Sequence, residues 1–134
     1  MPSRHRAGVL DTGTFIDLDL LEPASLPTIA EITSITLAEL HQGVAIAKNA
    51  ATRAARMEKL NAAVADFDPL PFDANAAARY GTLVTLIMSI GRKPHARKMD
   101  LMIAAIASTQ GLPLYTRNAD DFKGLERVVD VESL

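Results

Sequence analysis

Four acidic residues lie where an α/β chain would bring them together. Asp11 ends the first apolar run, and Glu39 lies in the helix expected after the second strand. Asp100 precedes an apolar helix, and Asp121 follows a late strand. Carboxylates a few ångströms apart repel one another, and a hard divalent cation such as Mg²⁺ or Mn²⁺ relieves the repulsion. Such an ion activates water and stabilises a leaving oxygen, so the pattern predicts phosphodiester hydrolysis.

Each acid also has a simpler explanation. Asp11 and Asp100 stand where helix N-caps are expected. Glu39 follows Thr36 by three residues, which is the spacing of a capping box. Asp120–Asp121 has the composition of a solvated turn. The joint pattern favours the metal site, because capping does not explain why acids from separated elements should meet at one end of a sheet.

Two polar residues and a basic segment lie near these acids in the sequence. Thr116 and Asn118 either orient the site or serve ordinary strand-end and turn roles. Residues 91–99 carry four cations and one histidine, and form either a solvated loop or a contact for a nucleic-acid backbone. The cations predicted to contact RNA are Arg92, Lys93, Arg97, Lys98 and Arg117, with Arg4, His5 and Arg6 as possible additions. Aromatic residues are only 4% of the chain, which argues against a base-stacking platform.

Strands and helices that alternate along the chain must position these residues. Strands are predicted at Ala7–Leu10, Thr28–Ile35, Leu112–Thr116 and Arg127–Val131, with a short extended segment at Pro69–Phe72. Helices are predicted from about Thr36, at Ala51–Asp66, at Ala74–Ile90 and at Leu101–Thr109, with helical turns at Phe15–Leu20 and Asn118–Phe122. This alternation predicts an α/β fold with a parallel sheet covered on both faces.

Length and composition limit the remaining possibilities. The 134 residues predict one domain, and 49% hydrophobic with 22% charged residues excludes intrinsic disorder. The absence of cysteine excludes disulfides, zinc–thiolate sites and thiol catalysis. With a net charge of −2, nucleic-acid binding would require a local basic patch. No signal peptide or membrane-spanning run is present, so a soluble, cytoplasmic protein is expected.

Four stretches carry a resemblance to a known family: Val9–Asp17, Ile35–Gly43, Gly91–Ala107 and Leu114–Phe122. In order and spacing they resemble the PIN domain, and specifically the VapC-type ribonuclease toxins of toxin–antitoxin pairs. The resemblance implies a three-layer α/β/α sandwich around a mostly parallel sheet, with strand order 3-2-1-4-5. It places the family's metal-binding acids on Asp11, Glu39, Asp100 and Asp121, and the family's Thr-x-Asn motif on Thr116–Asn118.

The same resemblance implies a Mg²⁺- or Mn²⁺-dependent endoribonuclease, a homodimer, and a cognate antitoxin that covers the acidic cleft, often with an inserted basic side chain. Its RNA substrate, with tRNA and rRNA as candidates, would be selected by shape and by single-stranded or loop context. One position departs from the family, since Gly13 stands where Asn or Ser is usual. Thr12 or Thr14 would then have to supply the missing hydrogen bond beside the acids.

Other classes share parts of this pattern. Asp11–Thr14 matches the Asp-Thr-Gly-Thr of aspartic proteases, but those chains are all-β. It is also similar to the phosphate-accepting aspartates of haloacid-dehalogenase-like hydrolases, which usually carry a second Asp where Gly13 stands. The main alternative is a receiver-like, Mg²⁺-binding phosphoacceptor domain, which would need adjacent acids after the first strand and a lysine after the last. A PIN fold kept only as a binding scaffold is disfavoured, because all four acid positions are filled.

Overall fold

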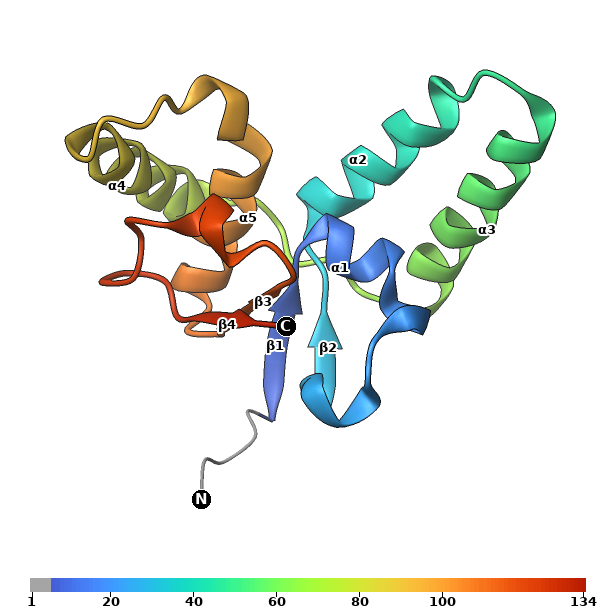
Figure 1. Ribbon diagram of the computed structural model, residues 1–134, viewed down its shortest axis with the longest axis horizontal. Helices are drawn as coiled ribbons and strands as arrows, with labels where there is room; N and C mark the ends of the chain where they lie inside the picture. The colour runs from blue at the N-terminus through green and yellow to red at the C-terminus, as the bar shows by residue number, and fades with distance from the viewer. Residues whose placement is uncertain (1–5) are drawn as a thin grey trace.

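A computed structural model describes residues 6–134 and shows a parallel sheet flanked by helices (Figure 1). The strands are β1 (Ala7–Leu10), β2 (Ile29–Glu31), β3 (Leu114–Thr116) and β4 (Val131–Ser133). The helices are α1 (Thr12–Ile16), α2 (Ser34–Ala45), α3 (Ala50–Asp66), α4 (Ala74–Ser89) and α5 (Lys98–Thr109), with 3-10 turns η1 (Leu18–Leu20), η2 (Pro23–Ser25), η3 (His95–Arg97) and η4 (Ala119–Phe122). The basic positions Arg4 and His5 lie outside the described residues.

The four strands are all parallel and run in the order β2-β1-β3-β4. The predicted α/β class is therefore confirmed. The predicted five-strand order differs at one place, because the segment expected as the third strand forms only one parallel bridge, between Leu70 and Thr33. Pro69 and Pro71 flank Leu70 and have no backbone N–H to donate to a ladder, so the segment cannot extend into a strand.

The bounds of three predicted strands are wrong. β3 begins at Leu114 rather than Leu112, because the Leu112 backbone N–H donates to the Ala107 carbonyl at 3.0 Å and closes the turn after α5. The second strand ends at Glu31, because the Thr33 side chain caps α2 by accepting a hydrogen bond from the Thr36 backbone N–H at 3.2 Å. The last strand begins only at Val131, because the backbone N–H groups of Val128 and Val129 both donate to the Leu125 carbonyl at 2.9 Å and close a turn. In each case a hydrogen-bonded cap or turn overrides the β propensity of the apolar run.

The fold has two apolar cores, one of which includes the strand residues Val9 and Leu114, and Figure 1 shows α4 and α5 to one side of the sheet and α1, α2 and α3 to the other. Helix α5 is buried almost all round, as its apolar sequence predicts, with Leu101, Ile103 and Ile106 fully buried. The second core joins Phe15 and Leu60, among others, between α1 and α3. No helix within residues 6–134 combines the length and the hydropathy needed to cross a bilayer.

Candidate functional site

Asp11 follows the last residue of β1 and is held from two sides. One carboxylate oxygen, Oδ1, accepts the Thr14 backbone N–H at 3.0 Å and caps α1, so the capping interpretation of this acid is correct. The other oxygen, Oδ2, accepts the Thr116 hydroxyl at 2.6 Å. The side chain is buried, with 7% of the residue exposed. Asp11 therefore does more than cap a helix, because its second oxygen is tied to the end of β3.

Glu39 lies in α2 and faces α1. The Thr12 hydroxyl donates to Glu39 Oε1 at 2.7 Å. The capping-box interpretation is wrong, because the N-cap of α2 is Thr33 and not Thr36. The sequence left open whether Thr12 or Thr14 replaces the side chain that Gly13 lacks. Thr14 does not, because its hydroxyl is buried without a hydrogen-bond partner among the described residues. Thr12 is the residue that supplies a hydrogen bond to an acid here.

Asp100 lies in the first turn of α5, three residues after the N-cap position Arg97, so it is not itself an N-cap. The pKa of Asp100 rises from its ordinary value of 3.8 to about 6. The largest cause is burial, followed by repulsion from Asp121, Asp11 and Glu39, while Arg97 acts in the opposite direction. All three other acids therefore lie near enough to Asp100 to oppose its ionisation.

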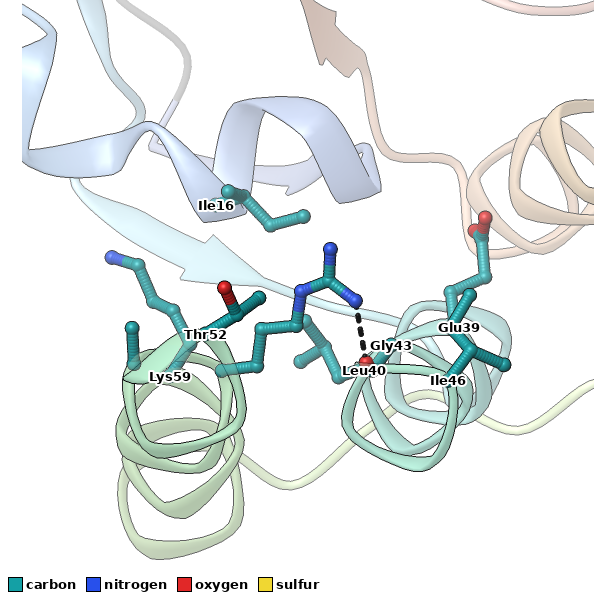
Figure 2. Close-up of a pocket in the computed structure, with 9 residues that line it drawn as sticks. Ile16, Glu39, Leu40, Gly43, Ile46, Thr52 and Lys59 are labelled. Atoms are coloured by element: carbon teal, nitrogen blue, oxygen red, sulfur yellow. Dashed lines mark hydrogen bonds between the residues drawn. The ribbon is translucent and has the colours of Figure 1, made fainter. Parts of the chain in front are cut away.

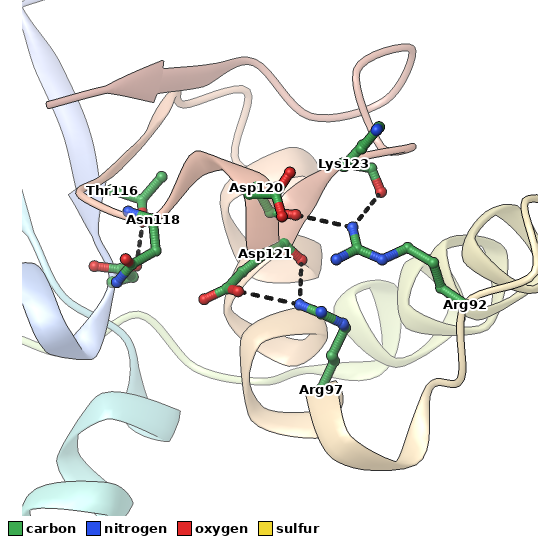
Figure 3. A network of polar contacts seen from close by, with 8 residues as sticks. Arg92, Arg97, Thr116, Asn118, Asp120, Asp121 and Lys123 are labelled. Carbon is green, nitrogen blue, oxygen red and sulfur yellow. Dashed lines mark hydrogen bonds and ion pairs between the residues drawn. The ribbon is translucent and has the colours of Figure 1, made fainter.

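Asp121 lies in η4 and is paired with a cation of the basic segment. Arg97 Nη1 lies 3.2 Å from Asp121 Oδ1 and donates at the same distance to the Asp121 backbone carbonyl (Figure 3). Arg92 Nη1 similarly donates to the backbone carbonyls of Asp120, at 2.8 Å, and Lys123, at 3.2 Å. Two of the cations predicted to contact RNA thus hold η4 in place.

Of the remaining predicted site residues, some contact other parts of the protein and others are exposed. Asn118 donates its backbone N–H to the Thr116 hydroxyl at 2.9 Å, which fixes that hydroxyl beside Asp11. Arg117 pairs with Asp17 at 2.9 Å. Lys93 and Lys98 are exposed. The sequence alone could not distinguish these exposed lysines from Arg92 and Arg97, which bind other parts of the protein.

The donor chemistry of the site fits Mg²⁺ or Mn²⁺, because all four acids offer oxygen ligands and their mutual repulsion is expressed in the pKa of Asp100. Across residues 6–134, no three His, Asp or Glu side chains are arranged as a group that could hold an ion. Three of the acids are instead engaged by other residues: Arg97 pairs with Asp121, Thr12 donates to Glu39, and Thr116 donates to Asp11. For Asp121 to bind an ion, its pair with Arg97 would have to open.

A cleft that the sequence did not predict adjoins Glu39 (Figure 2). It has a volume of about 690 Å³ and lies among residues of α1, α2 and α3; the apolar side chains of Ile16, Leu40 and Ile46 line it together with the polar side chains of Thr52, Arg56 and Lys59. Arg56 crosses from α3 to α2 and donates to the Gly43 carbonyl at 2.6 Å. Ile16 and Ile46 remain 45% and 63% exposed, so an apolar surface reaches the edge of the acidic site.

Comparisons with known proteins identify relatives in sequence and in fold. No protein-family profile matches the chain. It is 38% identical over 135 residues to Ribonuclease VapC5 of Mycobacterium tuberculosis, covering 98% of this chain and 97% of the relative. The solved structure of VapBC-5 from Mycobacterium tuberculosis, described as a member of the VapBC family of toxin–antitoxin systems, matches with a TM-score of 0.83 and 39% identity over 96% of this chain and 98% of that one.

A more distant likeness is to the structure of FitAcB from Neisseria gonorrhoeae, with a TM-score of 0.68 and 28% identity over 92% of this chain and 94% of that one. The predicted resemblance is thus confirmed by the relatives, and Asp100 and the three acids that raise its pKa lie in the stretches that carried it. The chain belongs to the VapC family of PIN-domain ribonucleases, the toxins of VapBC toxin–antitoxin systems.

Proposed function

We propose that this ribonuclease is a Mg²⁺- or Mn²⁺-dependent endonuclease that cleaves RNA phosphodiesters at a site built from Asp11, Glu39, Asp100 and Asp121. The observation that carries the proposal is the raised pKa of Asp100, which three other acids help to cause. Carboxylates that oppose one another's ionisation create a repulsion that a divalent cation would remove.

The chain's own residues prepare this site before any substrate arrives. Asp11 and Thr116 join the ends of two adjacent parallel strands, and Thr12 holds one oxygen of Glu39. A bound divalent ion would supply activation of water and stabilisation of the leaving oxygen. Because Thr116 and Thr12 are already hydrogen-bonded to their acids, two of the four carboxylates need little reorganisation when the site is used.

The RNA backbone would lie along the exposed side of the basic segment. Lys93 and Lys98 are exposed and close in sequence to Asp100, and their charge offsets the acidic balance of the chain locally. Selection would come from the shape and loop context of an RNA such as tRNA or rRNA rather than from reading a groove. Lys93 and Lys98, rather than Arg92 and Arg97, are the residues proposed to contact phosphate.

A cognate antitoxin would inhibit the enzyme by covering the acids and inserting a cation among them. Two structures that resemble this chain are described as VapBC-5, from a family of toxin–antitoxin systems, and FitAcB. The cleft lined by Ile16, Leu40 and Ile46 begins at Glu39 and would bind apolar side chains of the antitoxin. We also expect a homodimer that acts in the cytoplasm.

Cleavage of a structured RNA by the purified protein tests the proposal, with Mn²⁺, with Mg²⁺ and with EDTA. Asp121→Asn should abolish metal-dependent cleavage, whereas Asp120→Asn should retain it. The two acids are adjacent in η4, but Asp120 is exposed and is not among the residues that raise the pKa of Asp100. Cleavage that persists in EDTA, or equal loss in both variants, would contradict the four-carboxylate site.

A further inference from the structure

A chain of hydroxyl groups leads from the protein interior to Glu39. Thr36 in α2 is fully buried, and its Oγ1 lies 2.9 Å from Thr12 Oγ1 in α1. Thr12 Oγ1 in turn donates to Glu39 Oε1 at 2.7 Å. Thr36 is therefore one hydroxyl away from an acid of the site, although it makes no direct hydrogen bond with that acid.

The direction of this chain follows from counting hydrogens. A threonine hydroxyl carries one hydrogen, and an ionised carboxylate can only accept. Thr12 gives its single hydrogen to Glu39, so the hydrogen between the two threonines must come from Thr36. The order is thus Thr36 to Thr12 to Glu39, and each link strengthens the next because the terminal acceptor is charged.

Helix capping does not account for the Thr36 hydroxyl. The Thr36 backbone N–H is already satisfied by the Thr33 side chain, which is the N-cap of α2. The hydroxyl instead points to α1, whose first residue, Thr12, directly follows Asp11. The contact therefore links the position of Glu39 in α2 to the segment that carries Asp11.

We propose that Thr36 is a positioning residue of the ribonuclease reaction, which acts through Thr12 to hold the Glu39 carboxylate toward the other acids. This inference rests on the proposed function, because it requires Glu39 to take part in the reaction. Without the Thr36 hydrogen, Thr12 Oγ1 loses the hydrogen bond that it accepts, so it holds Glu39 less firmly while Glu39 keeps its charge.

The test compares Thr36→Val, which keeps the branched shape and removes the hydrogen, with Thr36→Ser, which keeps the hydrogen. Thr36→Val should lower kcat and Mn²⁺ affinity, measured by calorimetry, by roughly fivefold each, with KM for RNA unchanged. Thr36→Ser should stay within about twofold of wild type. Thr109→Val is the matched control, because that hydroxyl bonds only to the Ile106 carbonyl at the far end of α5 from Asp100.

A double-mutant cycle with Glu39→Gln separates positioning from general stability. In the Glu39→Gln background, Thr36→Val should cause no further loss of single-turnover cleavage. An equal loss in both backgrounds, or wild-type Mn²⁺ affinity in folded Thr36→Val, overturns the positioning role. Full activity of Glu39→Gln would overturn the proposed four-carboxylate function instead.

Should Thr36→Val fail to fold, Thr12→Val breaks the same chain at its partly exposed second link. It should reproduce the loss of Mn²⁺ affinity and show the same absence of further loss in the Glu39→Gln background. Wild-type Mn²⁺ affinity in Thr12→Val would overturn the proposal, because Glu39 would then be oriented without either hydroxyl.

Discussion

Thr116 donates its hydroxyl hydrogen to Asp11 Oδ2 at 2.6 Å, across 105 residues of the chain. The two residues lie at the ends of β3 and β1, which are neighbours in the parallel sheet. Both are buried, so water does not compete for the bond. The contact shows how a parallel sheet brings side chains distant in sequence to one edge, which is where ligands bind in open α/β folds.

Thr116→Val should remove this bond and leave the buried Asp11 carboxylate with one fewer donor. A hydrogen bond to a charged group is worth on the order of 1.5–3 kcal/mol, so kcat should fall by at least about tenfold. Thr116→Ser keeps the hydroxyl and should retain most of the activity. Steady-state cleavage of RNA with saturating Mn²⁺ measures both, and equal losses in the two variants would show that the hydroxyl is not responsible.

The raised pKa of Asp100 should appear as a pH dependence of stability in the metal-free protein. Because the pKa is about 6 in the folded chain and 3.8 ordinarily, the folded state binds this proton more tightly than the unfolded state. The free energy of unfolding should therefore fall as pH rises from about 4, through the folded pKa of about 6, to about 7, and this group should cause no further fall at higher pH.

The Asp100→Asn variant has no carboxyl group at this position, so it serves as the reference for the effect of Asp100 ionisation on stability. Over the same pH interval, the variant should become progressively more stable relative to wild type, because only wild type loses the contribution of the Asp100 proton. Urea denaturation in EDTA at several pH values measures the difference, in which carboxylates distant from Asp100 cancel. A difference that does not change with pH would mean that burial and the neighbouring acids leave Asp100 unperturbed.

Arg97→Met should show how much the guanidinium group beside Asp121 contributes to stability and to the pKa of Asp100. The ion pair is partly exposed, with 26% and 44% of the two side chains accessible, so its loss should cost less than about 1 kcal/mol of stability. The pKa of Asp100 should rise further, because Arg97 is the cation that lowers it. Carboxyl NMR titrations of wild type, Arg97→Met and the charge-retaining Arg97→Lys measure this shift, and an unchanged titration in Arg97→Met would contradict it.

Much of this arrangement could be predicted from residue pattern alone. Val9 and Leu10 predict the buried first strand, and the apolar run after Asp100 predicts a buried helix; both are confirmed. These predictions succeed because burial follows directly from runs of apolar residues. Boundaries set by single hydrogen bonds were less predictable: the cap at Thr33 shortened one strand, and two prolines reduced another to one bridge.

By itself, the sequence determined the class of fold, the family and the set of candidate acids, because residue types, their spacing and local propensity can be identified in the sequence. Only the tertiary structure decided that Arg97 faces Asp121 while Lys98 is exposed, and that Thr36 reaches Glu39 through Thr12. Neighbouring cations look equivalent in a sequence, and a hydroxyl has many available partners. The partner of each such side chain depends on how α1, α2, α5 and η4 pack around the same edge of the sheet.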